Sequence, residues 1–101
     1  MESSEDQKSI TAWGEETFGP AINPAVLVAR AKVEMDELLE AVAAGDHAEA
    51  ALETADVLIL LYRVATLCGF DVNRAVDRKM AINRARRWAR KGDGTGSHIK
   101  G

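Results

Sequence analysis

Two pairs of carboxylates, each spaced i, i+3, occur in consecutive segments of this 101-residue chain. Glu34 and Glu37 lie in the stretch EMDE, and Glu53 and Asp56 lie in ETAD, just before the apolar run of residues 57–62. Side chains three residues apart share one face of a helix. Carboxylates beside a core are costly unless they are paired, protonated or bound to metal. The pattern therefore predicts a compensating group near these four side chains.

The two pairs lie level if their segments form an antiparallel helical hairpin. The turn between them is centred on Gly45 and Asp46, about ten residues after the first pair and nine before the second. At 1.5 Å per residue the pairs then match in height to within roughly 2 Å. Four carboxylates at one height repel unless a cation lies among them, and Mg²⁺ takes such oxygen ligands. The alternative is a charged surface neutralised by Arg30, Lys32 or Arg63.

Cap and stop signals predict an all-α chain of four helices and no sheet. Ser4, Asn23, Asp46 and Asp71 are the expected N-caps. The helices are expected at about residues 5–17, 24–44, 47–68 and 72–90, with an irregular glycine-rich tail from about residue 91. The run 57–62 also fits a buried strand by periodicity alone, but about 22 residues without a turn signal favour a helix.

Charge and composition exclude several classes of protein. Residues 1–60 hold 13 acidic and 3 basic side chains, whereas residues 61–101 hold 3 and 10. This asymmetry is compatible with nucleic-acid binding through the basic residues 74–91. The chain as a whole is acidic, however, and carries no recognised nucleic-acid-binding motif. The apolar run is too short to span a membrane. The single cysteine, Cys68, excludes an internal disulfide, is expected to be buried, and favours a cytoplasmic protein.

The order of motifs resembles the MazG-like all-α nucleoside triphosphate pyrophosphohydrolases. EMDE and ETAD match their ExxE and ExxD motifs, and KMAINRARRW (residues 79–88) matches their basic, Asn-containing helix. With TFGP and the tail DGTGSHIKG, the chain from about Trp13 to Gly101 is similar to the phage-associated dATP/dGTP pyrophosphohydrolase branch. One departure is that Val33 precedes Glu34 where many relatives have a second Glu, which leaves the number of metal ions open.

The resemblance implies a reaction and a metal site. It implies that Glu34, Glu37, Glu53 and Asp56 bind Mg²⁺ or Mn²⁺ and act through a metal-activated water. The expected reaction cleaves a (d)NTP, with a purine dNTP favoured, between the α and β phosphates to give (d)NMP and pyrophosphate. The alternative is a non-catalytic helical interaction or regulatory module with a structural metal.

Five further residues are candidates for substrate binding. Lys79, Asn83 and Arg86 follow i, i+4, i+7 spacing and form one stripe, which suits contact with phosphates and, for Asn83, a sugar or base. The alternative is a solvated basic helix end. Trp13 and Phe18 either stack on a purine or fasten the first helix to the bundle.

The chain is expected to form one domain over residues 1–101 whose bundle is completed by oligomerisation. A bundle of this size is too small to enclose a nucleotide at its centre. We therefore expect an oligomer in which the second and third helices of two protomers pack together and complete each pocket, and the resemblance implies a homodimer or homotetramer. A nucleoside triphosphate is the expected ligand, and neither a membrane nor a nucleic acid is expected as a partner.

Overall fold

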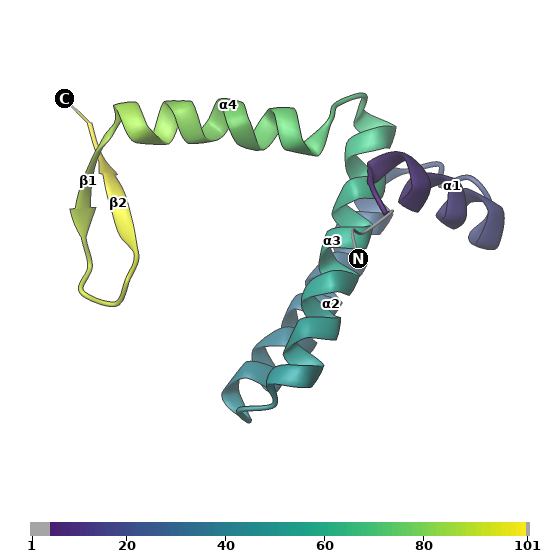
Figure 1. Ribbon diagram of the computed structural model, residues 1–101, viewed down its shortest axis with the longest axis horizontal. Coiled ribbons are helices and arrows are strands. Elements are labelled where there is room, and N and C mark those ends of the chain that lie inside the picture. Colours follow the sequence, from purple (N-terminus) through teal and green to yellow (C-terminus); the bar gives the residue numbers. More distant parts are fainter. Residues whose placement is uncertain (1–4, 101) are drawn as a thin grey trace.

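The computed structural model describes residues 5–100 as four helices followed by a β-hairpin (Figure 1). The elements are α1 (Gln7–Phe18), α2 (Pro24–Ala43), α3 (His47–Cys68), α4 (Val72–Ala85), β1 (Arg87–Arg90) and β2 (Gly96–Ile99). The four predicted helices are confirmed, and residues 57–62 are helical rather than a strand. The prediction that the chain has no sheet is wrong.

Three helices begin at the predicted N-caps because the side chains there satisfy free backbone donors. Asn23, Asp46 and Asp71 each accept a hydrogen bond from a backbone N–H two or three residues further on. Pro24, whose backbone has no N–H, is the first residue of α2. Gly69 ends α3 in the left-handed conformation, at a φ of 83°.

The start of α1 differs from the prediction by about two residues. The expected cap, Ser4, lies outside the described residues, and within them the N-cap is Asp6. The Asp6 carboxylate accepts the Ser9 N–H at 2.8 Å, and the Ser9 hydroxyl accepts the Asp6 N–H at 2.9 Å. The Ser9 N–H lowers the pKa of Asp6. This reciprocal pair is a capping box, so α1 begins at Gln7.

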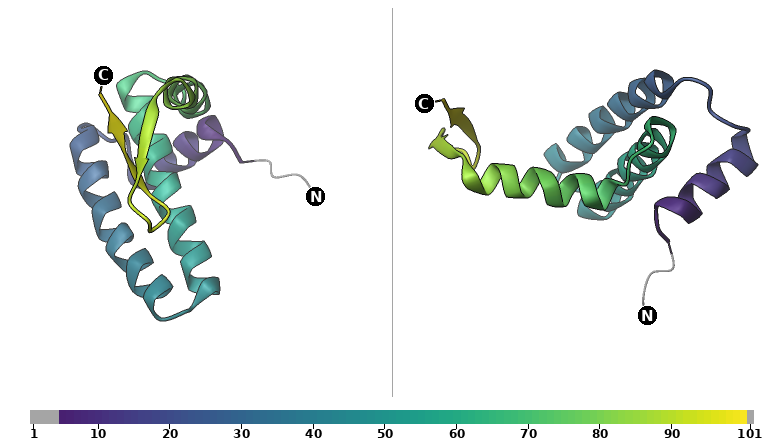
Figure 2. Two further views of the ribbon diagram at one scale, coloured as in Figure 1. Left: turned by 90° about the vertical axis from the view of Figure 1, so that its left-hand side faces the viewer. Right: turned by 90° about the horizontal axis from the view of Figure 1, so that it is seen from above.

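Antiparallel α2 and α3 form the central hairpin of the molecule (Figures 1 and 2). The buried apolar side chains among the described residues are Leu27, Ala31, Ala41, Val57 and Ala65. This core is small and contains no aromatic residue. Cys68, which was expected to be buried, is exposed at the end of α3.

Helix α1 crosses the end of α3 and is tied there by polar contacts. The Gln7 amide donates to the Phe70 carbonyl and accepts from the Val72 N–H, both at 2.8 Å. The hydroxyls of Thr11 and Thr66 are hydrogen-bonded at 2.8 Å. These contacts fix α1 beside the end of α3 that is far from the turn between α2 and α3 (Figure 1).

Helix α4 is shorter than predicted. It was expected to continue to residue 90, but it ends at Ala85 and Arg86 is extended. The Trp88 indole N–H donates to the Asn83 carbonyl at 2.8 Å, which satisfies a free acceptor of the last helical turn. The chain beyond α4 therefore turns back against the end of the helix.

A β-hairpin replaces the irregular tail that was expected. Strands β1 and β2 are antiparallel, with Arg87 opposite Ile99. Residues 91–95 form the turn, where Gly92 and Gly94 have φ angles of 94° and 93°. Only glycine adopts such angles without strain, so the glycines that suggested an irregular tail instead allow a compact turn.

We call residues 72–99 the arm, because α4 and the hairpin extend away from the other helices (Figures 1 and 2). The chain exposes 8052 Å² of surface, whereas a compact monomer of its 10.9 kDa exposes roughly 5,600 Å². Its radius of gyration is 16.2 Å, against about 13 Å for a compact domain. Among the described residues, no helix is long and apolar enough to cross a membrane.

Candidate metal centre and nucleotide site

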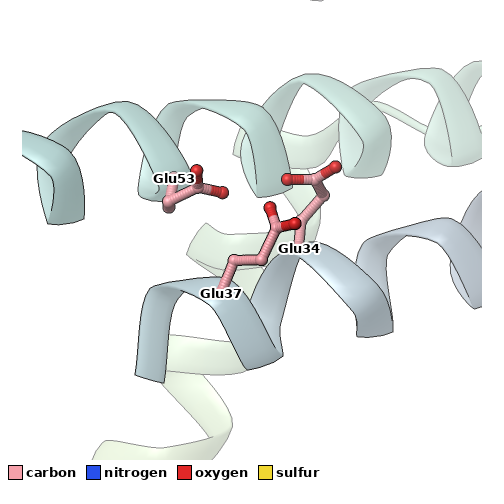
Figure 3. A group of neighbouring side chains, drawn as sticks. All are labelled: Glu34, Glu37 and Glu53. Carbon is pink, nitrogen blue, oxygen red and sulfur yellow. The ribbon is translucent and has the colours of Figure 1, made fainter. Parts of the chain in front are cut away.

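Three of the four predicted carboxylates converge between α2 and α3 (Figure 3). Glu34 and Glu37 project from α2 and Glu53 from α3, and one oxygen of each lies within 4.8 Å of the others. Glu34 and Glu53 are each only 9% exposed. The antiparallel hairpin therefore brings the two motifs to one height, as their distances from the turn predicted.

The electrostatics of this cluster favour a bound cation. Burial raises the pKa of Glu53 to about 8, and the nearby carboxyls of Glu34, Glu49 and Glu37 contribute to the rise. Glu34 likewise raises the pKa of Glu37. One Glu53 oxygen is buried without a hydrogen-bond partner in the described part of the chain. Since an unpaired buried acceptor is costly and hard divalent cations take carboxylate oxygens, these residues fit a divalent metal.

The alternative of salt bridges accounts for only one of these carboxylates. Arg30 lies 3.5 Å from Glu34, but its side chain is 66% exposed, and exposed pairs neutralise little. Across residues 5–100, Lys32 and Arg63 form no ion pair within 4 Å. Asp56, the fourth predicted ligand, is exposed one turn beyond Glu53 and is not among the converging groups.

The basic stripe is not brought to the carboxylates of its own chain. Lys79 and Asn83 lie on α4 and Arg86 lies just after it, so all three belong to the arm that leaves the hairpin (Figure 1). The side-chain oxygen of Asn83 is buried and has no hydrogen-bond partner among the described residues. Such an orphaned acceptor requires a donor from outside this part of the chain.

The two candidate aromatics contact each other on α1. The rings of Trp13 and Phe18 meet edge to face, with centroids 5.5 Å apart, and the side chains are 53% and 69% exposed. Trp13 also lines a mostly apolar cavity of about 580 Å³ between α1 and α3, with Ile10, Leu58, Ile59 and Tyr62 among the lining residues. The pair therefore offers exposed ring surface next to α3.

One residue of this region was not singled out as a substrate contact. Arg63 on α3 is 7% exposed, and its guanidinium lies 5.7 Å from the centre of the Phe18 ring. It also lies against Gly14 of α1, where an added Cβ would clash with it. The signal in the sequence was Gly14 itself, since glycine inside a helix is less stable than alanine by about 1 kcal/mol.

Comparisons with known proteins give one consistent set of relatives. A family model described as dATP/dGTP pyrophosphohydrolase matches residues 7–101. The dATP/dGTP diphosphohydrolase of cyanophage S-2L is 44% identical over 98 residues, covering 97% of this chain and 89% of that protein. A dATP/dGTP diphosphohydrolase of Salmonella phage PMBT28 is 43% identical over 94 residues, which cover 92% of this chain but 30% of that protein.

A solved structure is also similar over nearly the whole chain. It is the cyanophage S-2L MazG-like pyrophosphohydrolase bound to dGDP and three catalytic Mn²⁺ ions per active site. The two structures have a TM-score of 0.77 and 44% sequence identity, with 94% of this chain and 90% of that chain covered. The likeness therefore extends over nearly all of the chain.

Proposed function

Since the chain belongs to the dATP/dGTP pyrophosphohydrolase family, we propose that it hydrolyses purine dNTPs between the α and β phosphates. The products are the dNMP and pyrophosphate, and the metal is Mg²⁺, with Mn²⁺ as a substitute. One observation carries the proposal: oxygens of Glu34, Glu37 and Glu53 lie within 4.8 Å of one another between two packed helices. Such an enzyme acts on the nucleotide pool, and hence in the cytoplasm.

The three glutamates hold the cation, and Asp56 supplies a fourth carboxylate from the next turn of α3. A bound divalent cation neutralises phosphate charge and makes water a usable nucleophile near neutral pH. The glutamates are positioned by the packed hairpin before substrate arrives. Phosphoryl transfer depends mainly on such positioning and on charge neutralisation. Arg30, paired with Glu34, limits the rotation of that ligand.

The active form is a homodimer or homotetramer of this single domain. The exposed surface exceeds that of a compact monomer by roughly 2,400 Å², and obligate interfaces bury about 2,000–5,000 Å² in total. An apolar stripe follows one face of α2 at spacings of seven, four and three residues: Val28, Met35, Leu39 and Val42. These side chains are 43–68% exposed. Packing of this stripe against a second copy joins the two α2–α3 hairpins.

The arm acts at the site of a second copy. Residues 70–101 hold nine Lys and Arg and three Asp, whereas residues 1–69 hold four basic and thirteen acidic side chains. The cationic arm of one copy is thus complementary in charge to the acidic residues 1–69 of a second copy. There Lys79 and Arg86 contact the phosphates, and Asn83 either donates its amide N–H to a phosphate or accepts with its unpaired Oδ1 from the sugar or base.

Pyrophosphate release from the four dNTPs and four NTPs, with Mg²⁺ or Mn²⁺, tests the activity. Glu53→Gln keeps the shape of the side chain but removes a metal ligand, so its turnover is expected to fall by at least about 100-fold. Glu40→Gln is the matched control, because Glu40 is an exposed α2 carboxylate outside the cluster. Metal binding without turnover of any nucleotide by the wild type would contradict the proposal and leave a structural metal in a non-catalytic module.

A further inference from the structure

Arg63 is a buried cation without a counter-charge. Arg63 is only 7% exposed, and it forms no ion pair with any residue between 5 and 100. No hydrogen bond of its five N–H donors to another described residue is recorded in the structure. Arginines are seldom buried unless they are paired, and removing a charge from water without a partner is costly. The guanidinium is therefore arranged for an acceptor from outside this chain.

The cradle around the guanidinium is built into two helices. At Gly14 a Cβ would come within 2.4 Å of Nε and within 2.8 Å of Cζ of Arg63, so only glycine allows the side chain to lie flat on α1. The guanidinium also lies over the Phe18 ring of α1, with its Cζ 5.7 Å from the ring centre. A small, partly open cavity lined by Thr11, Glu15, Ala21 and Leu67 borders Arg63. Glu15 shares this cavity but does not form an ion pair with Arg63.

The position of Arg63 relative to the carboxylates matches the dimensions of a nucleotide. Arg63 follows Asp56, the proposed fourth ligand, by seven residues or about 10 Å along the axis of α3, and it follows Glu53 of the cluster by ten residues or about 15 Å. A dNTP whose phosphates lie at the carboxylates extends its base across the sugar by a similar length. The guanidinium is thus placed for the base rather than for the triphosphate.

We propose that Arg63 reads the N7/O6 edge of a purine base, which makes it a determinant of substrate choice. This inference rests on the proposed function. Arginine donates two parallel hydrogen bonds to N7 and O6 of guanine. Adenine offers N7 but has a donor in place of O6, and pyrimidines have no N7. The order of preference that Arg63 imposes is therefore guanine, then adenine, then pyrimidines. Phe18 contacts the guanidinium and Trp13 contacts Phe18, so their exposed rings are available for apolar contact with the base.

The test compares dGTP with 7-deaza-dGTP, which lacks only the N7 acceptor. With wild-type protein and Mn²⁺, kcat/KM is expected to be about 5- to 150-fold higher for dGTP. In Arg63→Gln this ratio is expected to approach one, and the ratio of dGTP to dCTP to fall by a similar factor. Arg63→Lys, which keeps the charge but not the fork, is expected to be intermediate. Arg30→Gln is the matched control, since Arg30 pairs with Glu34 and should change kcat/KM equally for all bases.

Two outcomes overturn the inference. Equal losses for every base in Arg63→Gln indicate a phosphate contact, and unchanged ratios with a lower melting temperature indicate a structural cation. Wild-type discrimination between the two guanine nucleotides needs no variant, so the test does not depend on the folding of Arg63→Gln. Calorimetric binding of dGDP and 7-deaza-dGDP gives the same ratio without turnover. An inert protein that still distinguishes these ligands through Arg63 contradicts the proposed function and not this inference.

Discussion

Glu37 of α2 and Glu53 of α3 have carboxylate oxygens within 4.8 Å of one another, although the helices that carry them run in opposite directions. Two carboxylates at this distance do not both ionise readily in the absence of a cation. Burial, together with the neighbouring carboxyls, raises the pKa of Glu53 to about 8, and Glu34 raises the pKa of Glu37. The metal-free site is therefore partly protonated at neutral pH.

Metal affinity is expected to rise with pH up to about 8. Below that pH the Glu53 carboxyl holds a proton that a cation must displace, because only the ionised form binds metal. The apparent affinity for Mn²⁺ should increase about tenfold per pH unit between pH 6 and 8 and then level off. Calorimetry in buffers of different ionisation enthalpy measures both the affinity and the proton released. A flat profile would show that Glu53 is already ionised in the metal-free protein.

The stability of the metal-free protein is expected to show the opposite dependence on pH. The pKa of Glu53 in the folded protein lies above its unfolded value of about 4.5. The stability that the protonated Glu53 carboxyl contributes to the folded protein is therefore fully present below pH 4.5 and is lost as pH rises through about 8. The melting temperature should therefore fall between pH 5 and 8.5. Glu53→Gln should abolish most of this fall, and Glu40→Gln should leave it unchanged. Saturating Mn²⁺ should raise the melting temperature most at pH 8.5.

Local signals along the chain were sufficient for the helical part of the fold and for the convergence of three of the four predicted carboxylates. The caps at Asn23, Asp46 and Asp71 depend on side chains that bond within three residues, so they are visible in the sequence. The alignment of Glu34 with Glu53 needs only the distance of each from the turn. These features were predictable because each depends on local geometry.

Other features depend on contacts that no local pattern specifies. The hairpin after α4 was missed because its glycines were read as an irregular tail, although two four-residue extended runs flank the turn. The contact of Arg63 with Gly14 joins residues 49 positions apart, and only the crossing of α1 over α3 brings them together.

Gly14 and Arg63 are expected to be coupled in stability. Alanine at position 14 gains helix propensity of up to about 1 kcal/mol, but its Cβ would overlap the Arg63 side chain. Overpacking costs about 1–3 kcal/mol, so Gly14→Ala should be neutral to destabilising in the wild type. In Arg63→Ala the same change should be stabilising. Urea unfolding of the four proteins gives the coupling, and additive effects would mean that Arg63 does not lie against α1 in solution.

Gly14→Ala also provides a second way to displace the guanidinium without removing it. Since the end of the Arg63 side chain is flexible, the added methyl group should move it rather than unfold the helix. Base discrimination between dGTP and 7-deaza-dGTP should then decrease as in Arg63→Gln, with little change in kcat for dGTP. Ala12→Gly is the reverse control, because Ala12 is exposed on the same helix. It should lower the helix stability without changing the discrimination.

Two inactive variants are expected to restore activity when they are assembled together. Glu53→Gln lacks a metal ligand, and Lys79→Ala combined with Asn83→Ala lacks the contacts of the arm. If the arm acts in a second copy, a mixed dimer has one site in which the carboxylates and the arriving arm are both intact. Random mixing should recover about one quarter of wild-type activity. If the arm instead acts in its own chain, every site of the mixed dimer retains a defect, and the mixture stays as inactive as its components.

Glu53→Gln mixed with Glu37→Gln is the matched control, because both defects lie in the carboxylate cluster. No recovery is expected in that mixture, since each carboxylate cluster lies within one chain.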